Sequence, residues 1–231
     1  MFELMLTNRS KEPGYVLPNN LGPGPQTLIG GDASAGYFGE FTPAEFITPE
    51  AVMNMNKPTV GKLINGTYNW LKFVYRGKIL LVCKYAAWQD VKRTDLKAVN
   101  IYPGAAITVG ANRFIHRCMR IDIVDPTSIT DAVIHTPGSN KNLDQSEWGS
   151  LMFPVLSQAA GGLGRWANFS KAGMGWFAVG SPGNVCLTYE SPKNGIGFCY
   201  IGGFNGAGWK NVATGNSAAW MGHRPVLELI Q

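Results

Sequence analysis

The sequence predicts an α+β protein in which short antiparallel strands and two short helices are separated by long loops rich in glycine and tryptophan. Of its 231 residues, 45% are hydrophobic and 15% are charged, which supplies enough apolar material for a substantial core. The 29 glycines and 14 prolines require many turns between short elements. These proportions exclude a disordered chain and a helical bundle.

Composition also limits the classes of partner that we expect for this protein. The net charge of +5 comes from 20 basic and 15 acidic residues that are scattered along the chain, so no basic stripe for nucleic acid is expected. The sequence contains no uninterrupted apolar stretch of about 18 residues, so membrane insertion is not expected. The N-terminus has no basic segment followed by the apolar core of a secretory signal, so we expect synthesis in the host cytoplasm, or exit from it by a route that needs no signal.

Residues 1–27 are predicted to form an extended arm, because four prolines and three glycines fall between positions 11 and 27. An apolar tip precedes them. In an assembly this arm could lie across a neighbouring subunit, which favours a homo-oligomer, and a flexible tail is the alternative. Residues 28–65 are expected to form a short linking or assembly segment, and 66–231 the folded domain. The residues of the apolar tip are Phe2, Leu4, Met5 and Leu6.

Local patterns predict the elements. Two hairpins are expected, at 70–84 across Arg76-Gly77 and at 106–121 across Gly110, the second with one buried and one wet face. Thr42-Pro43 and Thr48-Pro49 begin short helical turns. One helix is expected over 88–99, and another is capped by Asp144 with Trp148, Leu151, Met152 and Val155 on one face. Further strands are expected at 37–41, 175–179, 185–189, 196–201 and 225–230.

Four motifs carry a resemblance to a known family. They are GYFGEF at 36–41, WLKFVYRGKILLVCK at 70–84, SEWGSLMFPV at 146–155 and HRPVLELI at 223–230. In this order they resemble structural proteins of tailed-bacteriophage virions. The order of hairpins, helices, loop-rich region and final strand resembles the C-type-lectin-like fold, including its relatives in the formylglycine-generating-enzyme superfamily. The resemblance covers about residues 28–231 and implies that fold for 66–231.

The resemblance implies a non-enzymatic virion protein of the tail, baseplate, fibre or collar, whose partners are other virion proteins. A capsid decoration protein or a free lectin-like module that binds carbohydrate or protein is the alternative. We expect no catalytic residue, because no nucleophile elbow, phosphate-binding loop or zinc-protease motif is present. The strand that begins at Pro225 is expected to be buried near the first hairpin, and Arg224 to anchor the preceding loop through carbonyls or a carboxylate.

No cofactor and no metal is expected. Trp209-Lys210-Asn211 places a lysine where a lectin-type calcium site needs an oxygen ligand. The formylglycine-generating relatives raise the question of a copper-binding cysteine pair, for which Cys186 and Cys199 are the candidates. Both lie in apolar strand-like runs, so buried thiols are expected, and a disulfide between them requires that their strands pair.

The region 160–222 interleaves aromatic residues with Gly, Asn and Ser, a mixture suited to a host-surface glycan or protein. Packing beneath the long loops is the competing interpretation for the same rings. The candidate ligand-binding residues are Trp166, Phe204, Trp209, Lys210 and Asn211.

Overall fold

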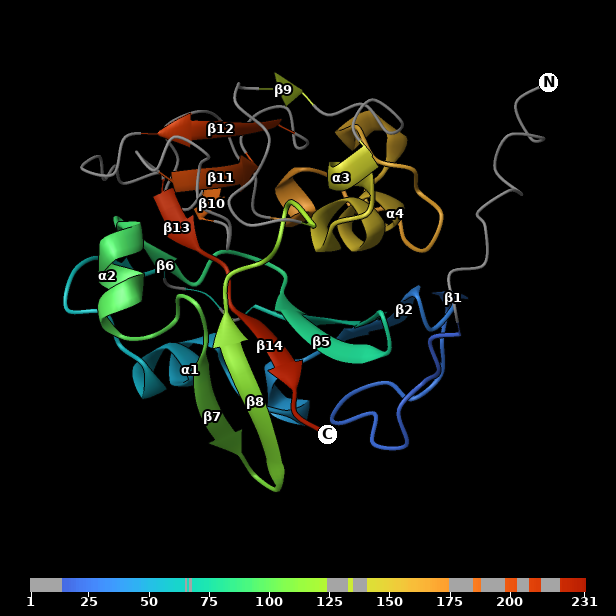
Figure 1. Ribbon diagram of the computed structural model, residues 1–231, viewed down its shortest axis with the longest axis horizontal. Helices are drawn as coiled ribbons and strands as arrows, with labels where there is room; N and C mark the ends of the chain where they lie inside the picture. Colours follow the sequence, from blue (N-terminus) through green and yellow to red (C-terminus); the bar gives the residue numbers. More distant parts are fainter. Residues whose placement is uncertain are drawn as a thin grey trace.

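The computed structural model has two seven-stranded sheets, one above the other in Figure 1, with short helices against them. It therefore has the predicted mixed α+β character, with mostly antiparallel strands. It describes residues 14–64, 66, 68–123, 141–174, 187 and 222–231 in full, and the backbone of 133–134, 185–186, 198–202, 208–212 and 221.

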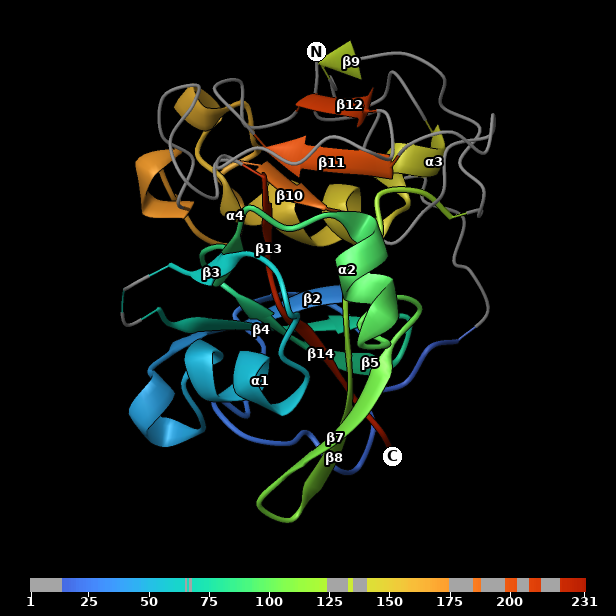
Figure 2. The ribbon, with the colours of Figure 1, turned by 90° about the vertical axis from the view of Figure 1, so that its left-hand side faces the viewer.

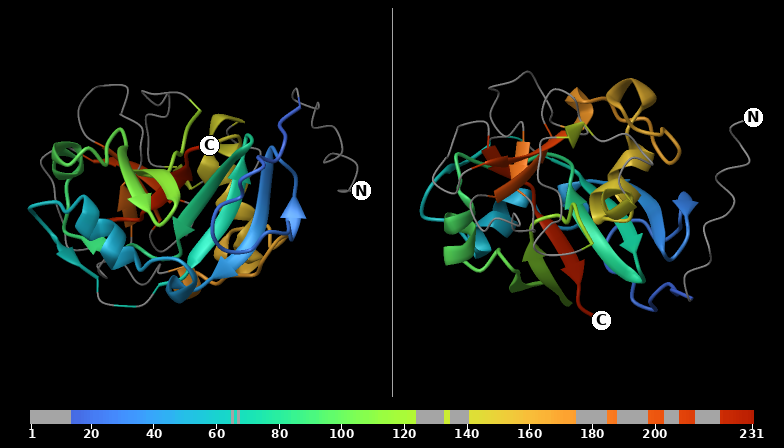
Figure 3. Two further views of the ribbon diagram at one scale, coloured as in Figure 1. Left: turned by 90° about the horizontal axis from the view of Figure 1, so that it is seen from below. Right: turned by 45° about the horizontal axis from the view of Figure 1, so that its top comes forward.

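The first sheet is antiparallel throughout, and its blue strands lie at one side and its green strands at the other in the left view of Figure 3. Its last strand in the sequence lies in the interior, between one strand from each hairpin. The spatial order is β1 (Gly30–Gly31), β2 (Ala35–Phe41), β4 (Trp70–Tyr75), β5 (Lys78–Cys83), β14 (Val226–Leu229), β8 (Asn112–Arg117) and β7 (Ala105–Val109).

Both predicted hairpins are confirmed. In β4–β5 the turn needs positive φ at Arg76 (50°) and Gly77 (75°), which suits a two-residue hairpin turn. In β7–β8 the turn contains Gly110 with a φ of 57°. The predicted pairing of the terminal strand with the first hairpin is also confirmed, because Leu227 lies opposite Leu81 of β5. Strand β2 pairs with β4, so the segment 28–65 contributes a strand to this sheet.

The second sheet collects short strands from distant parts of the chain. All its described pairings are antiparallel except β10 with β13. The expected strands near 185–189 and 196–201 are present in shorter or shifted form, and 175–179 lies outside the described residues. The spatial order is β3 (Lys62–Leu63), β6 (Trp88–Gln89), β13 (Met221–His223), β10 (Val185–Leu187), β11 (Phe198–Gly202), β12 (Gly208–Val212) and β9 (Val133–Ile134).

The helices of the described residues are short, and they are more numerous than the two expected. The turn at Thr48 is confirmed, since its hydroxyl accepts a hydrogen bond from the Ala51 N–H at 3.1 Å. None of the described helices is long and apolar enough to cross a bilayer. The helical segments are η2 (Pro43–Glu45), α1 (Pro49–Met55), α2 (Arg93–Ala98), α3 (Lys141–Asp144), η3 (Trp148–Met152), α4 (Phe153–Val155), η4 (Gln158–Ala160) and η5 (Ala172–Met174).

The helix predicted over 88–99 is wrong in its first half. Trp88 and Gln89 form strand β6, where the Trp88 indole N–H donates to the Val60 carbonyl at 2.9 Å. Asp90 has a φ of 54°, a left-handed conformation that stops a right-handed helix. The helix α2 therefore begins only at Arg93.

The helix cap predicted at Asp144 is also wrong. Asp144 is the last residue of α3, and the π-helical segment η3 follows at Trp148. The expected apolar face is confirmed, because Trp148, Leu151, Met152 and Val155 are all buried. Glu147, three residues after Asp144, turns toward the first sheet and binds Arg117.

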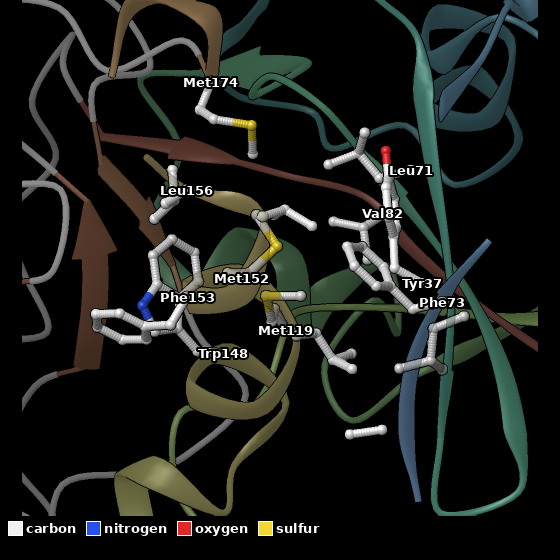
Figure 4. Close-up of a cluster of buried hydrophobic side chains, with 14 of the residues drawn as sticks. Tyr37, Leu71, Phe73, Val82, Met119, Trp148, Met152, Phe153, Leu156 and Met174 are labelled. Atoms are coloured by element: carbon white, nitrogen blue, oxygen red, sulfur yellow. The ribbon is translucent and has the colours of Figure 1, made fainter. Parts of the chain in front are cut away.

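Each face of the first sheet has its own core. Figure 4 shows one of them, in which Met152 and Phe153 of the helical segment lie across from Phe73 and Val82 of the sheet. The core on the opposite face includes Phe38, Trp70 and Leu227, together with Val52 of α1 and the partly buried Phe46 that follows η2. A third cluster lies between α1, α2 and the second sheet.

The described part of the predicted arm, residues 14–27, contains no helix or strand. The buried Lys72 of β4 holds it to the first sheet, because its Nζ donates to the Pro25 carbonyl at 2.6 Å. Burial lowers the pKa of Lys72 to about 8, and its ammonium lies 5.1 Å from the Phe38 ring centre. Residues 1–13, with Phe2, Leu4, Met5 and Leu6, lie outside the described residues.

Candidate functional site

Strand β8 brings the most chemically active side chains of the described structure together. Successive side chains of a strand point to opposite faces, so His116 and Arg117 lie on different sides of the first sheet. The second hairpin was predicted to keep one face wet. That prediction is wrong at this end of β8, where Arg117 is buried beneath the segment 141–174.

A histidine chain links the two sheets; we use this name for Asn56, His116, His223 and Cys118. The Nε2 atoms of His116 (β8) and His223 (β13) lie 3.0 Å apart. His116 Nδ1 lies 3.4 Å from Asn56 Oδ1, and Cys118 Sγ lies 3.5 Å from His223 Nδ1. Both rings are 0% exposed, so this chain connects strands from the two sheets inside the protein.

One proton assignment satisfies all three contacts of the histidine chain. The Cys118 thiol donates to His223 Nδ1, His223 Nε2–H donates to His116 Nε2, and His116 Nδ1–H donates to Asn56 Oδ1. Both imidazoles are then neutral. Burial lowers the pKa of His116 to about 3, and burial together with the nearby His116 lowers the pKa of His223 well below its usual value.

On the other face, Arg117 is the centre of an ion-pair network; the Arg117 network denotes Arg117, Glu147, Glu228 and Lys78. The guanidinium makes a bidentate contact with Glu147 at 2.5 and 2.9 Å and reaches Glu228 Oε2 at 2.9 Å. Lys78 reaches the other oxygen of Glu228 at 2.5 Å. The network therefore ties the helical segment to strands β5, β8 and β14.

The charges of Glu147 and Glu228 keep Arg117 ionised although its guanidinium is buried. Burial alone lowers the pKa of Arg117, but the charges and hydrogen bonds of Glu147 and Glu228 outweigh it and raise the pKa. Burial raises the pKa of Glu228, and the opposing charge of Arg117, with the contact from Lys78, lowers it overall. The Glu147 carboxylate also accepts the Arg120 N–H at 2.9 Å.

The predicted structural role of Arg224 is confirmed. Its Nη1 donates to the carbonyls of Cys83 and Lys84 at 3.3 and 2.6 Å, and its Nη2 donates to the Met174 carbonyl at 2.8 Å. The guanidinium thereby joins the end of β5, the loop before β14 and the segment η5. Arg224 is 2% exposed, so its guanidinium is buried and binds these carbonyls in the interior of the protein.

The predicted ligand-binding residues are only partly described. Phe204 lies outside the described residues. Trp209, Lys210 and Asn211 lie on β12, where Trp209 is opposite Ile201 of β11. The structure describes the backbone of these three residues but not their side chains. Trp166 is half-buried and packs against the core that Figure 4 shows.

An open hollow of about 470 Å³ lies beside η4. Exposed amide side chains from Gln158 and Asn168 line it, together with Ser157 and Leu163. Trp166 does not line it, because its indole lies over the backbone of Gly30 and Gly31, where an added Cβ would collide with the ring. The hollow is a polar surface feature, and Trp166 has a packing role.

The glycines at 161–164 do not form a phosphate cradle. The N–H groups of Gly161 and Gly162 donate to the carbonyls of Gln158 and Ser157, and that of Gly164 donates to Leu156. A phosphate loop presents such N–H groups to its ligand, whereas these hold the loop itself together.

No matching protein-family model, curated protein or solved structure was found. Within the described ranges, no three His, Cys, Asp or Glu side chains are grouped so that they could hold a metal ion.

The register of the second sheet bears on the cysteine pair. Strands β10 and β11 do pair, but Cys186 lies opposite Ile201, two residues from Cys199. Such diagonal positions are about 7–8 Å apart, beyond the usual Cα separation of a disulfide. The backbone register therefore does not favour a direct Cys186–Cys199 bond.

Sequence reasoning missed the histidine chain and the Arg117 network. His116 and His223 are 107 residues apart, and Arg117 and Glu228 are 111 apart, so no local spacing reveals either contact. The available signal was the run from Phe114 to Ile121, in which basic residues alternate with apolar ones in a strand that enters the core.

Trp166→Ala is expected to lower the free energy of unfolding by roughly 1–2 kcal/mol, because it removes a half-buried ring from the core and from Gly30–Gly31. Denaturant unfolding measures this change. Arg165→Ala, at an exposed neighbouring position, is the control and is expected to change stability by less than about 0.5 kcal/mol. Equal stability of both variants would show that Trp166 is not part of the core.

Proposed function

We propose that this chain is a non-enzymatic structural protein of a tailed-phage virion, in the tail, baseplate, fibre or collar, and that residues 66–231 adopt a C-type-lectin-like fold. The support is the placement of the four motifs that resemble such proteins. They form β2, the β4–β5 hairpin, the helical segment over the first sheet, and the end of β13 with β14.

The observation that carries the proposal is that the charged residues of these motifs bind the motifs to one another. Lys78 of the second motif binds Glu228 of the fourth, and Glu147 of the third is joined to Glu228 through Arg117, which lies outside the motifs. Arg224 of the fourth motif binds carbonyls at the end of the second. These charged side chains therefore hold distant segments of the chain together, which suits a structural role.

The histidine chain supports a non-enzymatic role in the same way. A general base must reach a proton of its substrate, and His116 and His223 are fully buried between the sheets. Their lowered pKa values keep them neutral, which suits packing of the two sheets.

A lectin-like binding module is the second candidate, and the hollow beside η4 is the observation that favours it. Its exposed amides, Gln158 and Asn168, could hydrogen-bond sugar hydroxyls. A host-surface glycan or protein would then be the ligand, whether the module is free or carried on a particle. A capsid decoration protein would share the same scaffold.

The test is the composition of virions purified by density gradient from the phage that encodes this chain. Mass spectrometry is expected to find the chain at a fixed copy number per particle, and antibody labelling in electron micrographs to place it at the tail, baseplate, fibre or collar. Labelling over the head would favour the decoration protein. Absence of the chain from intact particles, together with binding of the purified chain to host cells, would favour the free module.

A further inference from the structure

We propose that strand β7 is a homotypic interface, at which two copies of this chain pair edge to edge and join their first sheets. The observation is that β7 is uncharged and pairs with no described strand other than β8, in a hairpin that projects from the body of the protein in Figures 1 and 2. This inference does not depend on the proposed virion role.

Strand β7 differs from the other edges of the described sheets. Edge strands β1, β3 and β9 have two residues each, and the Trp166 indole lies against β1. Strand β7 has five residues and pairs on one side with β8. Its sequence, AAITV, has none of the charges or prolines with which proteins usually protect an exposed edge from pairing.

The register shows which backbone groups face the open side. Arg113 of β8 accepts the Ile230 N–H at 2.9 Å, so its backbone faces β14. Its neighbour Phe114 therefore faces β7 and pairs with Ile107. By the same alternation, the N–H and C=O groups of Ala106 and Thr108 point away from β8. Both residues are exposed.

A second copy satisfies these four groups with one symmetric arrangement. If a twofold axis passes at Ile107, Ala106 of each copy lies opposite Thr108 of the other. Each such pair exchanges two hydrogen bonds, giving four in all. No charged side chain of β7 opposes another across the axis, because the strand carries none. This self-complementarity identifies a second copy as the occupant.

The interface is expected to be weak in isolation. Pairing of one five-residue edge is small beside a standard interface of about 1,600 Å². A dissociation constant of roughly 10–500 µM is therefore expected for the free protein. In an assembly that holds copies close together, the effective concentration would exceed this value.

Sedimentation equilibrium of the full chain is the first test, with a reversible dimer expected. Thr108→Pro removes an N–H that points to the open side while leaving the bonds to β8, and a proline is tolerated at a sheet edge. It is expected to weaken dimerisation at least about tenfold. Thr108→Val keeps the N–H and is the matched control, expected to dimerise like the original chain.

Circular dichroism and the melting temperature check that each variant folds, and Thr108→Lys replaces Thr108→Pro if the proline variant does not. A chain that stays monomeric up to about 1 mM would overturn the proposal. So would a dimer that Thr108→Pro and Thr108→Lys leave unchanged, because the copies would then meet elsewhere.

Cysteine cross-linking tests the register. In the proposed pairing, position 106 of one copy faces position 108 of the other at about 5.5 Å between Cα atoms, within disulfide range. A mixture of the Ala106→Cys and Thr108→Cys chains is expected to give a cross-linked dimer on oxidation, in excess of that formed by either chain alone. Equal cross-linking in all three samples would contradict the proposed register.

Discussion

Arg117→Met is expected to lower the free energy of unfolding by about 3–5 kcal/mol, the usual cost of leaving one member of a buried ion pair without its partner. The Glu147 side chain is 3% exposed and would lose both of its contacts with the guanidinium. Glu228 is better placed, because it is 19% exposed and keeps Lys78. Equilibrium unfolding in urea measures the change.

Two further variants separate charge from packing. Arg113→Met lies on the same strand at an exposed position, and we expect it to change stability by less than about 0.5 kcal/mol. The double variant Arg117→Met with Glu147→Leu removes both buried charges, so it is expected to be more stable than Arg117→Met alone. If the double variant is instead the less stable, the buried charge of Glu147 is not the cause of the loss.

The histidine chain is expected to make the protein sensitive to mild acid. Native His116 has a pKa of about 3, and that of His223 is also lowered, whereas an unfolded histidine has a pKa near 6.5. Below about pH 6.5 the unfolded state therefore binds more protons, and stability falls as the pH falls. Two such histidines are expected to cost about 2.7 kcal/mol between pH 7.5 and pH 5.5.

His116→Gln identifies the source of this pH dependence. It removes one of the two titrating rings, so the loss between pH 7.5 and pH 5.5 is expected to fall to about half. The variant also loses a buried hydrogen bond, which lowers stability at both pH values and does not affect the difference. Urea unfolding at the two pH values gives this difference directly. A chain equally stable at both would show that the histidines are already solvated in the native state.

The sequence predicted the elements that local chemistry determines. The β4–β5 hairpin needs a turn with positive φ, and Arg76-Gly77 provides it next to two β-rich runs. The strand after Pro225 was predictable for a similar reason, since a proline suits the start of a buried strand. The anchoring role of Arg224, which directly precedes that proline, was also predicted from the sequence.

Prediction failed where distant segments decide the outcome. The sequence at 88–99 has an amphipathic helical pattern, but Trp88 and Gln89 form a strand that pairs with β3 on one side and β13 on the other. The second hairpin was expected to have one wet face, but Arg117 of β8 is buried because Glu147, from a segment 30 residues later, neutralises it. Neither the partner nor the covering segment can be inferred from the strand itself.

The position of β14 has a consequence for how the protein folds during synthesis. This strand is inserted between β5 and β8, and the contact between Arg117 and Glu228 spans 111 residues. The first sheet is therefore incomplete until residues 226–229 have left the ribosome. Until then β5 and β8 present open edges, that of β5 largely apolar, which is the state most exposed to aggregation and to chaperones. We therefore expect slow folding, and we expect the yield of folded protein to depend on how long these edges remain open.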